Sequence, residues 1–516
     1  MRIKGYILFV NKIRKIPFRI ILGFAIGIPL LISLDKVVTG NIPFWYDNAR
    51  DLLSAWGNLN KPTLIGPTSG IPGIFYGPYW IWFLSIGLLF SKDPRIANLG
   101  VGIFPYFIVF PFVLFQFAKL FNKYVLILIW LLFIFSTGIG YATSMWNPNL
   151  APVLFLVLVY LLVLTDYTKK GIRNYAKLSM GGFVAGLIIN FHISFGIGVF
   201  LGVLLFLITN TSLLYHTNKN QRKDILSLNI LFLFFFVIGL IFSFIPTLLF
   251  EYRHGFHQTK TAITAFTKYG AVVTVKGLSK GQILQLFFGR LSILLHINAF
   301  LAYILQVLVA IYVSLTIKYK KLLLDRNEIK LIIFLITASA GILFIYLSAR
   351  NPVWDYHFIG TEIIFLLLVG LIINKIPILK NVLTLWIIIL LVSESISFIN
   401  SLYINPYTNS SLFTKEYIVD TIARNANHTF YTVYDYSPSI YQYDYAYLFK
   451  WRANKDVPYD PSDNTASSLV FLIFPVISPS DKAGYINYRT PNSNYKTTKI
   501  WHIPDGSTIV KRERKK

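Results

Sequence analysis

The sequence predicts an all-α polytopic membrane protein with about eleven transmembrane helices and a small C-terminal α+β domain outside the membrane. Three observations lead to this fold class. Hydrophobic residues make up 55% of the 516 residues and charged residues only 14%, well below the roughly 25% charged residues of soluble proteins. Apolar stretches long enough to cross a bilayer recur along the chain. After Ser401 the composition changes to a polar, tyrosine-rich segment.

The charge distribution predicts the orientation in the membrane. The net charge is +26, and the lysines and arginines lie mostly in short loops between apolar stretches. This pattern is typical of cytoplasmic loops, so anionic lipid headgroups rather than nucleic acid are the expected partner. We expect a cytoplasmic (plasma) membrane protein with the N-terminus inside, an uncleaved first span and the C-terminal domain outside. Cysteine is absent, which excludes disulfides and thiolate chemistry.

The order of the spans follows from placing the basic loops in the cytoplasm. Segment 74–90 would add one crossing too many before the basic loop at Lys169, so we interpret it as an aromatic interfacial helix. The predicted spans are 17–38, 97–118, 124–142, 150–165, two short spans within 178–209, 225–250, 291–317, 331–348, 358–374 and 381–399.

The chain divides into a transmembrane domain, 1–400, and an extracytoplasmic domain, 401–516. The first outer loop would cover about 41–95 and a later one about 251–285. Within the second domain, Leu412 to Asn425 has a helical period and Leu469 to Ile477 resembles a buried strand.

The titratable residues gather at the predicted outer ends of the spans, whereas the span centres are almost free of charge. An ion-coupled transporter usually keeps ionisable groups near the midplane of the membrane. The distribution therefore favours a reaction at the outer leaflet. A membrane transporter or lipid flippase for a glycoconjugate is the competing interpretation, and a non-catalytic scaffold is a third.

The densest cluster, Trp45 to Asp51, follows the first span. In a helical turn, Asp47 and Asp51 would share one face with Arg50 beside them. These carboxylates are the candidate catalytic residues: Asp47 as general base, and Asp51 orienting Arg50 or the acceptor. Arg50 would keep the carboxylate ionised or contact a phosphate. A charged helix cap at the membrane surface would show the same pattern.

A second cluster, Glu251 to Lys260, begins where a span ends. Arg253, His254 and Lys260 suit a phosphate or pyrophosphate, because arginine gives forked hydrogen bonds and lysine a point charge. Snorkelling of these side chains to lipid headgroups is the alternative.

Further candidate substrate-binding residues lie in shorter outer loops: Trp146, Asn147, Asn149, His192, Asp355 and His357. The asparagines could equally cap a helix end, and a lone histidine is more often a structural group than a catalyst. No spacing typical of metal ligands occurs among the histidines. We therefore expect no cofactor, although a divalent metal stays open.

These residues resemble a known family. The outer-loop carboxylates, Leu64 to Pro67 with Gly77 to Trp80, and Trp146 to Asn149 are similar to bacterial glycosyltransferases of the GT-C superfamily. The similarity lies with its protein O-mannosyltransferase and aminoarabinose-transferase branch and covers roughly residues 17–400. The resemblance implies transfer of a hexosyl- or pentosyl-type sugar from a polyprenyl-phosphate donor to a lipid, glycan or protein acceptor, with inversion at the anomeric carbon.

The resemblance also implies a catalytic aspartate in the first outer loop, a position that Asp47 matches. A phosphate leaving group needs no general acid, so one carboxylate is sufficient to deprotonate the acceptor. The sequence departs from oligosaccharyltransferase relatives in the second outer loop, where Asn147 and Asn149 stand in place of an Asp-x-Asp motif. This difference argues against a metal-dependent chemistry of that kind.

Overall fold

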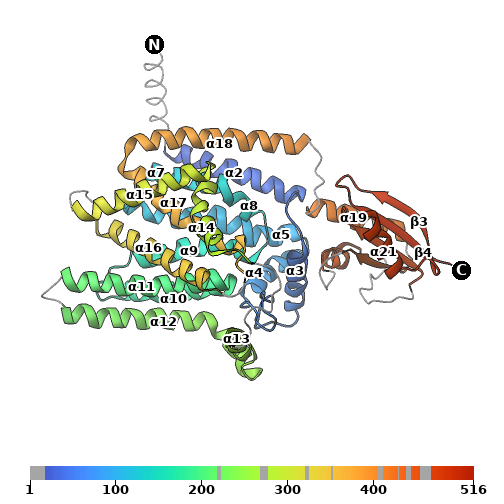
Figure 1. Cartoon of the computed structure of the whole chain (residues 1–516), viewed down its shortest axis with the longest axis horizontal. Helices are drawn as coiled ribbons and strands as arrows, with labels where there is room; N and C mark the ends of the chain where they lie inside the picture. The colour runs from blue at the N-terminus through green and yellow to red at the C-terminus, as the bar shows by residue number, and fades with distance from the viewer. Residues whose placement is uncertain are drawn as a thin grey trace, which may run out of the picture.

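The computed structural model is a helical bundle with a small α/β domain at one end (Figure 1). This architecture confirms the predicted fold class. The structure describes residues 18–217, 222–267, 277–319, 325–349, 352–403, 411–427, 429–436, 443–453 and 467–515. The predicted basic N-terminus, residues 268–276 of the later outer loop, and Arg350 and Asn351 lie outside the described residues.

The chain enters the bundle through α2 (Phe18–Thr39), which is long and apolar enough to cross a membrane. Two shorter helices follow, α3 (Tyr46–Asn58) and α4 (Tyr79–Phe90). The 12 residues of α4 span roughly 18 Å, which is less than the hydrocarbon thickness of about 30 Å. Its short length agrees with an interfacial position for segment 74–90.

The next helices extend from Pro94 to Arg253. A continuous apolar helix covers Pro94–Lys119, and its N-terminus is capped by Asp93, which accepts a hydrogen bond from the Arg95 backbone N–H at 2.9 Å. Within it lie α5 and α6, joined by π-helical turns. The regular helices of this region are α5 (Pro94–Asn98), α6 (Phe110–Phe115), α7 (Lys123–Phe133), α8 (Ile139–Ala142), α9 (Ala151–Val163), α10 (Ile172–Phe191), α11 (Ile193–Thr217) and α12 (Arg222–Arg253).

Two glycines permit unusually close helix packing. A Cβ on Gly182 of α10 would lie 1.8 Å from the Phe236 carbonyl oxygen of α12, and a Cβ on Gly202 of α11 would lie 2.4 Å from the Ala338 Cα. Small residues of this kind let membrane helices approach backbone to backbone. The predicted break within 178–209 occurs at His192, between α10 and α11, and both helices extend beyond the predicted ends.

The predicted span 291–317 is not a continuous helix. The structure has two helices there, α14 (Lys280–Leu295) and α15 (Ala299–Tyr319), bent by 99°. His296 takes the left-handed conformation that ends α14, with φ 49°, and the Asn298 side chain caps α15 by accepting from the Phe300 N–H at 2.8 Å. The start of α14 also lies earlier than predicted, because Ser279 and Gln282 form a capping box.

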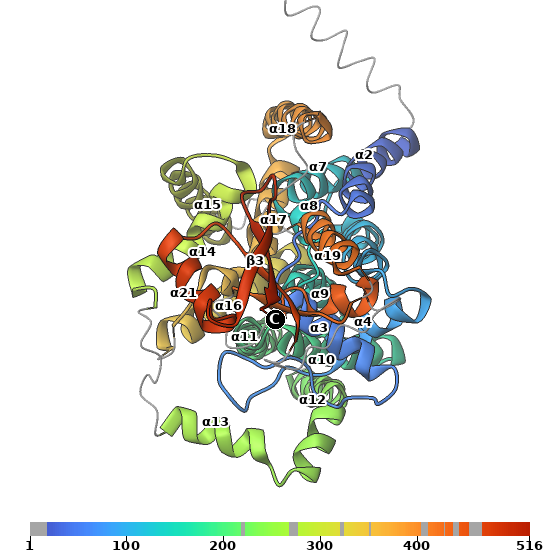
Figure 2. The ribbon, with the colours of Figure 1, turned by 90° about the vertical axis from the view of Figure 1, so that its right-hand side faces the viewer.

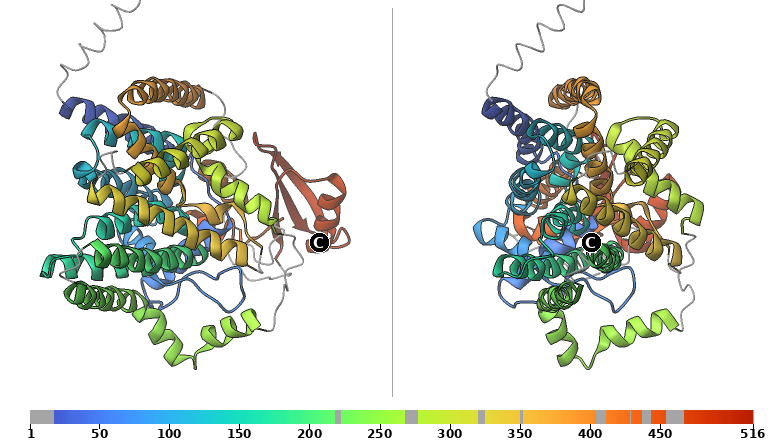
Figure 3. Two further views of the ribbon diagram at one scale, coloured as in Figure 1. Left: turned by 60° about the vertical axis from the view of Figure 1, so that its left-hand side comes forward. Right: turned by 90° about the vertical axis from the view of Figure 1, so that its left-hand side faces the viewer.

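The remaining helices of the bundle are α13 (His257–Thr267), α16 (Arg326–Ser348), α17 (Glu362–Lys375) and α18 (Pro377–Tyr403). Figures 1 and 3 both show α18 along one edge of the bundle. Among the described residues, seven helices are individually long and apolar enough to cross a membrane, or eight with the bent α14–α15 pair. The count of eleven spans stays a prediction.

The C-terminal domain contains a four-stranded sheet in the order β1-β2-β4-β3. β1 pairs with β2 in parallel, and the other two pairs are antiparallel. The predicted helix and buried strand of this domain are confirmed as α19 and β2, which is buried along its whole length. The elements are α19 (Leu412–Ala426), β1 (Thr432–Asp435), α20 (Ala446–Leu448), β2 (Leu469–Phe474), α21 (Pro479–Arg489), β3 (Tyr495–His502) and β4 (Thr508–Arg514).

The C-terminal domain packs against the end of the bundle that carries α3, as Figure 2 shows. Arg95, beside α4, forms a forked ion pair with Glu416 of α19, with both N–O distances 2.7 Å. The Tyr447 hydroxyl donates to the Lys92 carbonyl at 2.7 Å. Apolar residues of both parts belong to one continuous core. The domain therefore lies directly over the helices that follow the first span.

Candidate active site

The position of α3 is set by its first turn. The Trp45 backbone N–H donates to the Asn48 side-chain oxygen at 2.8 Å, and the Asn48 amide donates to the Met145 carbonyl. Asn48 is buried. One side chain therefore both caps α3 and attaches it to the loop that leads into Asn147.

The predicted helical turn of carboxylates is present in α3. Arg50 lies between the two acids: its Nη1 is 2.9 Å from Asp47 Oδ1 and its Nε is 2.8 Å from Asp51 Oδ1. The second oxygen of Asp51 accepts from the Trp80 indole N–H at 2.8 Å. The Asp47 side chain is 29% exposed, whereas that of Asp51 is 1% exposed. Asp47 alone of the pair is open to a substrate.

Burial and neighbouring charges shift the pKa values of Asp51 and Arg50. Burial raises the pKa of Asp51 to about 6, although the Arg50 charge and hydrogen bond act in the opposite direction. Burial also opposes the charge of Arg50, but the adjacent Asp51 and Asp47 carboxylates outweigh it and raise the pKa of Arg50 above its usual value. Arg50 therefore stays a cation that is partly neutralised on one side by a buried acid.

Aromatic side chains surround Asp47. The Trp45 and Trp146 rings meet edge to face with centroids 6.0 Å apart, and Trp146 lies 5.2 Å from the Tyr356 ring. Burial raises the pKa of Tyr356, and the charge of Asp47 adds to this effect. Tyr76 is affected in the same sense by burial, Tyr356 and Asp47. The charge of Asp47 thus acts on two tyrosines, Tyr76 and Tyr356, which come from two separate loops.

His192 and His357 lie next to the Tyr356 ring. His192 is 1% exposed, and its Nε2 lies 3.2 Å from the Tyr356 carbonyl, to which it donates as the neutral tautomer. Burial lowers the pKa of His192 to about 3 and that of His357 to about 4. The His357 Nδ1 accepts from the Trp354 N–H at 2.9 Å. Both imidazoles are neutral at physiological pH, and each forms a hydrogen bond with a backbone group.

The asparagines of the second outer loop also face inwards. Asn147 and Asn149 are buried, and their amides donate to the carbonyls of Phe191 at 2.7 Å and Ser144 at 3.1 Å. The Asn147 bond holds the turn against the end of α10, and the Asn149 bond lies within the loop itself. Trp146, which is half-buried, is the residue of this turn that faces Tyr356.

Arg290 is a functional candidate that the sequence interpretation missed. It lies in α14 and is 5% exposed. Its guanidinium donates to both the carbonyl and the carboxylate of Asp355 at 2.6 Å, and it lies 3.2 Å from Glu362. The Arg290 Nε has no hydrogen-bond partner within the described part of the chain. The sequence signal was a single arginine inside an apolar helix, which indicates a functional or paired group by default.

Glu362 completes this network. It is fully buried at the start of α17, and it accepts from the Tyr141 hydroxyl at 3.0 Å and the Gly360 N–H at 2.7 Å. Asp355, by contrast, has a side chain that is 69% exposed. The predicted candidate Asp355 therefore lies at the exposed end of a network whose buried members are Arg290 and Glu362, and it is the neighbour of Tyr356 in the chain.

The predicted phosphate-binding residues Arg253, His254 and Lys260 are exposed at the corner between α12 and α13. His254 stacks on Phe250 with centroids 4.1 Å apart. The loop between α3 and α4 covers this corner, because the Phe75 N–H donates to the Gln258 side chain at 2.8 Å. Figure 2 shows this loop between α3 and α13. The same loop carries Tyr76, so it connects the corner with the surroundings of Asp47.

No protein-family model and no curated protein sequence matches this chain. It is similar to the crystal structure of ArnT from Cupriavidus metallidurans bound to undecaprenyl phosphate, with a TM-score of 0.60, 9% identity, and 96% of this chain and 98% of that chain covered. A second similar structure is the Archaeoglobus fulgidus oligosaccharyltransferase in complex with Zn and sulfate, with a TM-score of 0.45, 14% identity, and coverage of 94% and 72%.

The likeness to ArnT extends over nearly the whole of both chains. It agrees with the fold that the resemblance of the outer-loop residues implies. The chain therefore has an ArnT-like fold, in which a carboxylate–arginine cluster follows α2, the first described helix.

Proposed function

We propose that this protein is a glycosyltransferase that moves a sugar from a polyprenyl-phosphate donor to an acceptor hydroxyl or amine at the outer membrane face. The observation that carries the proposal is the placement of Asp47. It is the accessible carboxylate of a fixed Asp–Arg–Asp cluster, surrounded by aromatic rings, in a chain with the ArnT-like fold. The ArnT structure contains undecaprenyl phosphate, and we propose the same class of lipid as the carrier of the donor sugar here.

In the proposed reaction Asp47 acts as the general base. The acceptor oxygen or nitrogen attacks the anomeric carbon, and Asp47 takes the proton that the acceptor loses. The bond between the anomeric carbon and the phosphate oxygen breaks, and the phosphate leaves with the electron pair. Attack opposite to the leaving group inverts the anomeric centre. Because the phosphate is a weak base, no acid is required on the leaving side.

Cations would stabilise the departing phosphate. Arg50 is adjacent to Asp47 and is 19% exposed, so it is the nearest candidate. Arg253 and Lys260 are exposed on the neighbouring corner and suit the carrier phosphate as it lies among the headgroups. Asp51 is a positioning residue in this mechanism, because both its oxygens are occupied by Arg50 and Trp80.

The aromatic surroundings have two roles in the proposal. Trp45, Trp146 and Tyr356 reduce water access to Asp47 and offer apolar faces on which a sugar ring can stack. The C-terminal domain contributes Tyr443, whose ring lies 5.2 Å from Tyr46. We infer that this domain borders the acceptor side of the site.

The test is incubation of the purified full-length protein with polyprenyl-phosphate sugars and measurement of free polyprenyl phosphate. Release that depends on Asp47 and on an added acceptor supports the proposal. A lipid transporter would instead move the labelled donor across a vesicle membrane with its glycosidic bond intact, and that result would overturn the proposal.

A further inference from the structure

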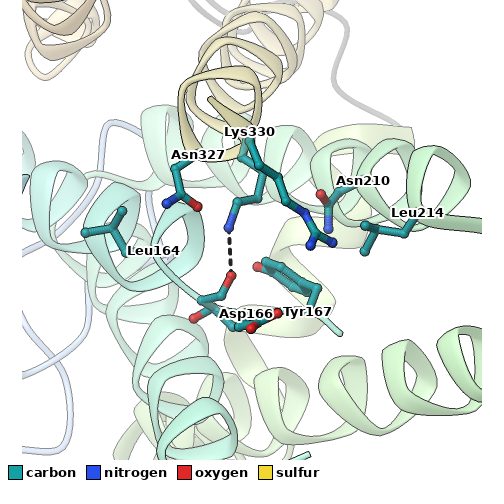
Figure 4. Close-up of a pocket in the computed structure, with 9 residues that line it drawn as sticks. Leu164, Asp166, Tyr167, Asn210, Leu214, Asn327 and Lys330 are labelled. Carbon is teal, nitrogen blue, oxygen red and sulfur yellow. Dashed lines mark hydrogen bonds between the residues drawn. The ribbon is translucent and has the colours of Figure 1, made fainter. Parts of the chain in front are cut away.

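A polar cavity lies at the opposite end of the bundle from Asp47. It has a volume of about 260 Å³ and lies between the segment after α9, the C-terminal part of α11 and the start of α16. Asp166, Tyr167, Asn210, Arg326 and Lys330 are among its lining residues, and Figure 4 shows the polar side chains directed towards one another. The 23 residues of α16 separate this cavity from the Tyr356 loop by roughly 34 Å.

Two donors in the cavity are buried and incompletely bonded. Asn210 is 1% exposed, and its amide nitrogen has no partner within the described residues. Lys330 is 6% exposed and donates to the Thr165 carbonyl at 2.8 Å, the dashed line in Figure 4. An ammonium group has three donors, so one backbone acceptor leaves the others for a ligand. Burial of such groups is costly unless something accepts their hydrogen bonds.

Arg326 adds a second positive charge. It is exposed at the first turn of α16, and within the described part of the chain its charge acts on the Asp166 carboxylate. Asp166 also accepts from the Thr168 N–H at 3.0 Å and the Thr168 hydroxyl at 2.6 Å, and its Oδ2 lies 3.8 Å from the Lys169 Nζ. Two cations, Arg326 and Lys330, thus line the cavity with one carboxylate that acts on both. These three side chains carry a net positive charge, and the Asn210 amide is a further donor.

We propose that this cavity binds a phosphate-bearing anion, either the headgroup of an anionic lipid or a free phosphate, through Asn210, Arg326 and Lys330. Two cations and a neutral amide donor match the acceptors of a phosphate monoester. The volume is below the roughly 300–1,000 Å³ of drug-sized sites, as expected for a headgroup or a small ion. The cavity lies beside the basic loop at Lys169, which the sequence predicts on the cytoplasmic side, where anionic lipids gather.

The test is titration of the full-length protein in detergent micelles with fluorescent phosphatidic acid. We expect the double variant Arg326→Gln/Lys330→Gln to bind this lipid at least about tenfold more weakly, as loss of charge-assisted hydrogen bonds implies. The matched control, Lys170→Gln/Arg173→Gln, removes the same charge from exposed residues that do not line the cavity. An equal loss in the control would mean unspecific attraction and would overturn the proposal.

A single isosteric change keeps the test valid if the double variant does not fold. Asn210→Asp retains the shape, removes the amide donor and adds a negative charge, so it should weaken binding by a similar factor while thermal unfolding shows a folded protein. Unchanged binding in this variant would exclude the cavity. Competition separates the two sources: displacement of the lipid by inorganic phosphate, but not by chloride of equal ionic strength, assigns a free phosphate, and no displacement assigns the lipid headgroup.

Discussion

The Asp51 carboxylate accepts a hydrogen bond from the Trp80 indole at 2.8 Å, which joins α3 to α4 inside the bundle. Trp80 is 1% exposed, so this contact is closed to solvent and to substrate. Asp47, one helical turn earlier, is partly open and shares Arg50 with Asp51. Two carboxylates that are equivalent in the sequence pattern therefore have different environments and different expected roles.

Asp47→Asn should reduce turnover by about 10²–10⁴-fold, the usual contribution of a general base. The amide keeps the shape of the side chain but cannot accept the proton of the acceptor. Expression, thermal unfolding and donor binding should stay close to those of the wild type. Asp51→Asn should have a milder effect on turnover, and Asp224→Asn, an exposed acid at the start of α12, serves as a control. If the effects of the Asp47 and Asp51 changes were reversed, Asp51 would be the base.

The contribution of Asp51 to the free energy of unfolding should decrease as the pH rises from about 4 to about 6. Its pKa is raised from 3.8 to about 6 in the folded state, so the unfolded chain releases this proton first. At 1.36 kcal/mol for each tenfold change in the ionisation constant, the loss is about 3 kcal/mol. The Tm of the Asp51→Asn variant should therefore increase relative to that of the wild type between pH 4 and pH 7. A constant difference across this range would contradict the burial of an ionisable Asp51.

Arg290→Ala should destabilise the protein by about 3–5 kcal/mol, because it leaves the buried Glu362 carboxylate without its cation. Adding Glu362→Gln should restore a large part of the loss, since the remaining group is then neutral. Thermal unfolding of the two variants in detergent measures both effects. Arg173→Ala, at an exposed position of α10, controls for loss of an arginine. Additive destabilisation in the double variant would mean that the pair does not interact as the structure indicates.

Arg253→Ala should raise the donor concentration needed for half-maximal rate by about tenfold or more, because a charge-assisted contact to the carrier phosphate is lost. Since Arg253 is exposed, its removal should hardly change thermal unfolding. The measurement is the donor dependence of the rate at saturating acceptor. An unchanged dependence of the rate on donor concentration would mean that Arg253 does not contact the donor.

The loop from about 41 to 95 should lie wholly outside the cytoplasm, with α4 not crossing the membrane. The protein contains no cysteine, so single cysteines at Gly70 and Ser91 report their own position. Gly70 has open space for a side chain. Both should react with an impermeant thiol reagent on intact cells, whereas a cysteine at Lys170 should react only after permeabilisation. Protection of the Ser91 position alone would mean that α4 crosses the membrane.

The sequence by itself determined the features that depend on local pattern. Apolar length predicted the helical membrane bundle, and the spacing of Asp47 and Asp51 predicted their common turn. The number of crossings allowed before the basic loop at Lys169 led us to interpret segment 74–90 as an interfacial helix, and the structure has the short helix α4 there. Periodicity also located α19 and β2. These features can be predicted because each depends on neighbours within a few residues in the chain.

Tertiary packing decided what local pattern leaves open. Only the contact of α3 with α4 buries Asp51, and only the approach of α14 to α17 brings Arg290 to Glu362 across 72 residues of sequence. The 99° bend between α14 and α15 interrupts an apolar stretch that looks continuous, because a left-handed His296 and a cap at Asn298 end one helix and begin the next. Burial, charge pairing and bends of this kind depend on groups distant in the chain, and hydrophobic periodicity carries no information about which of them meet.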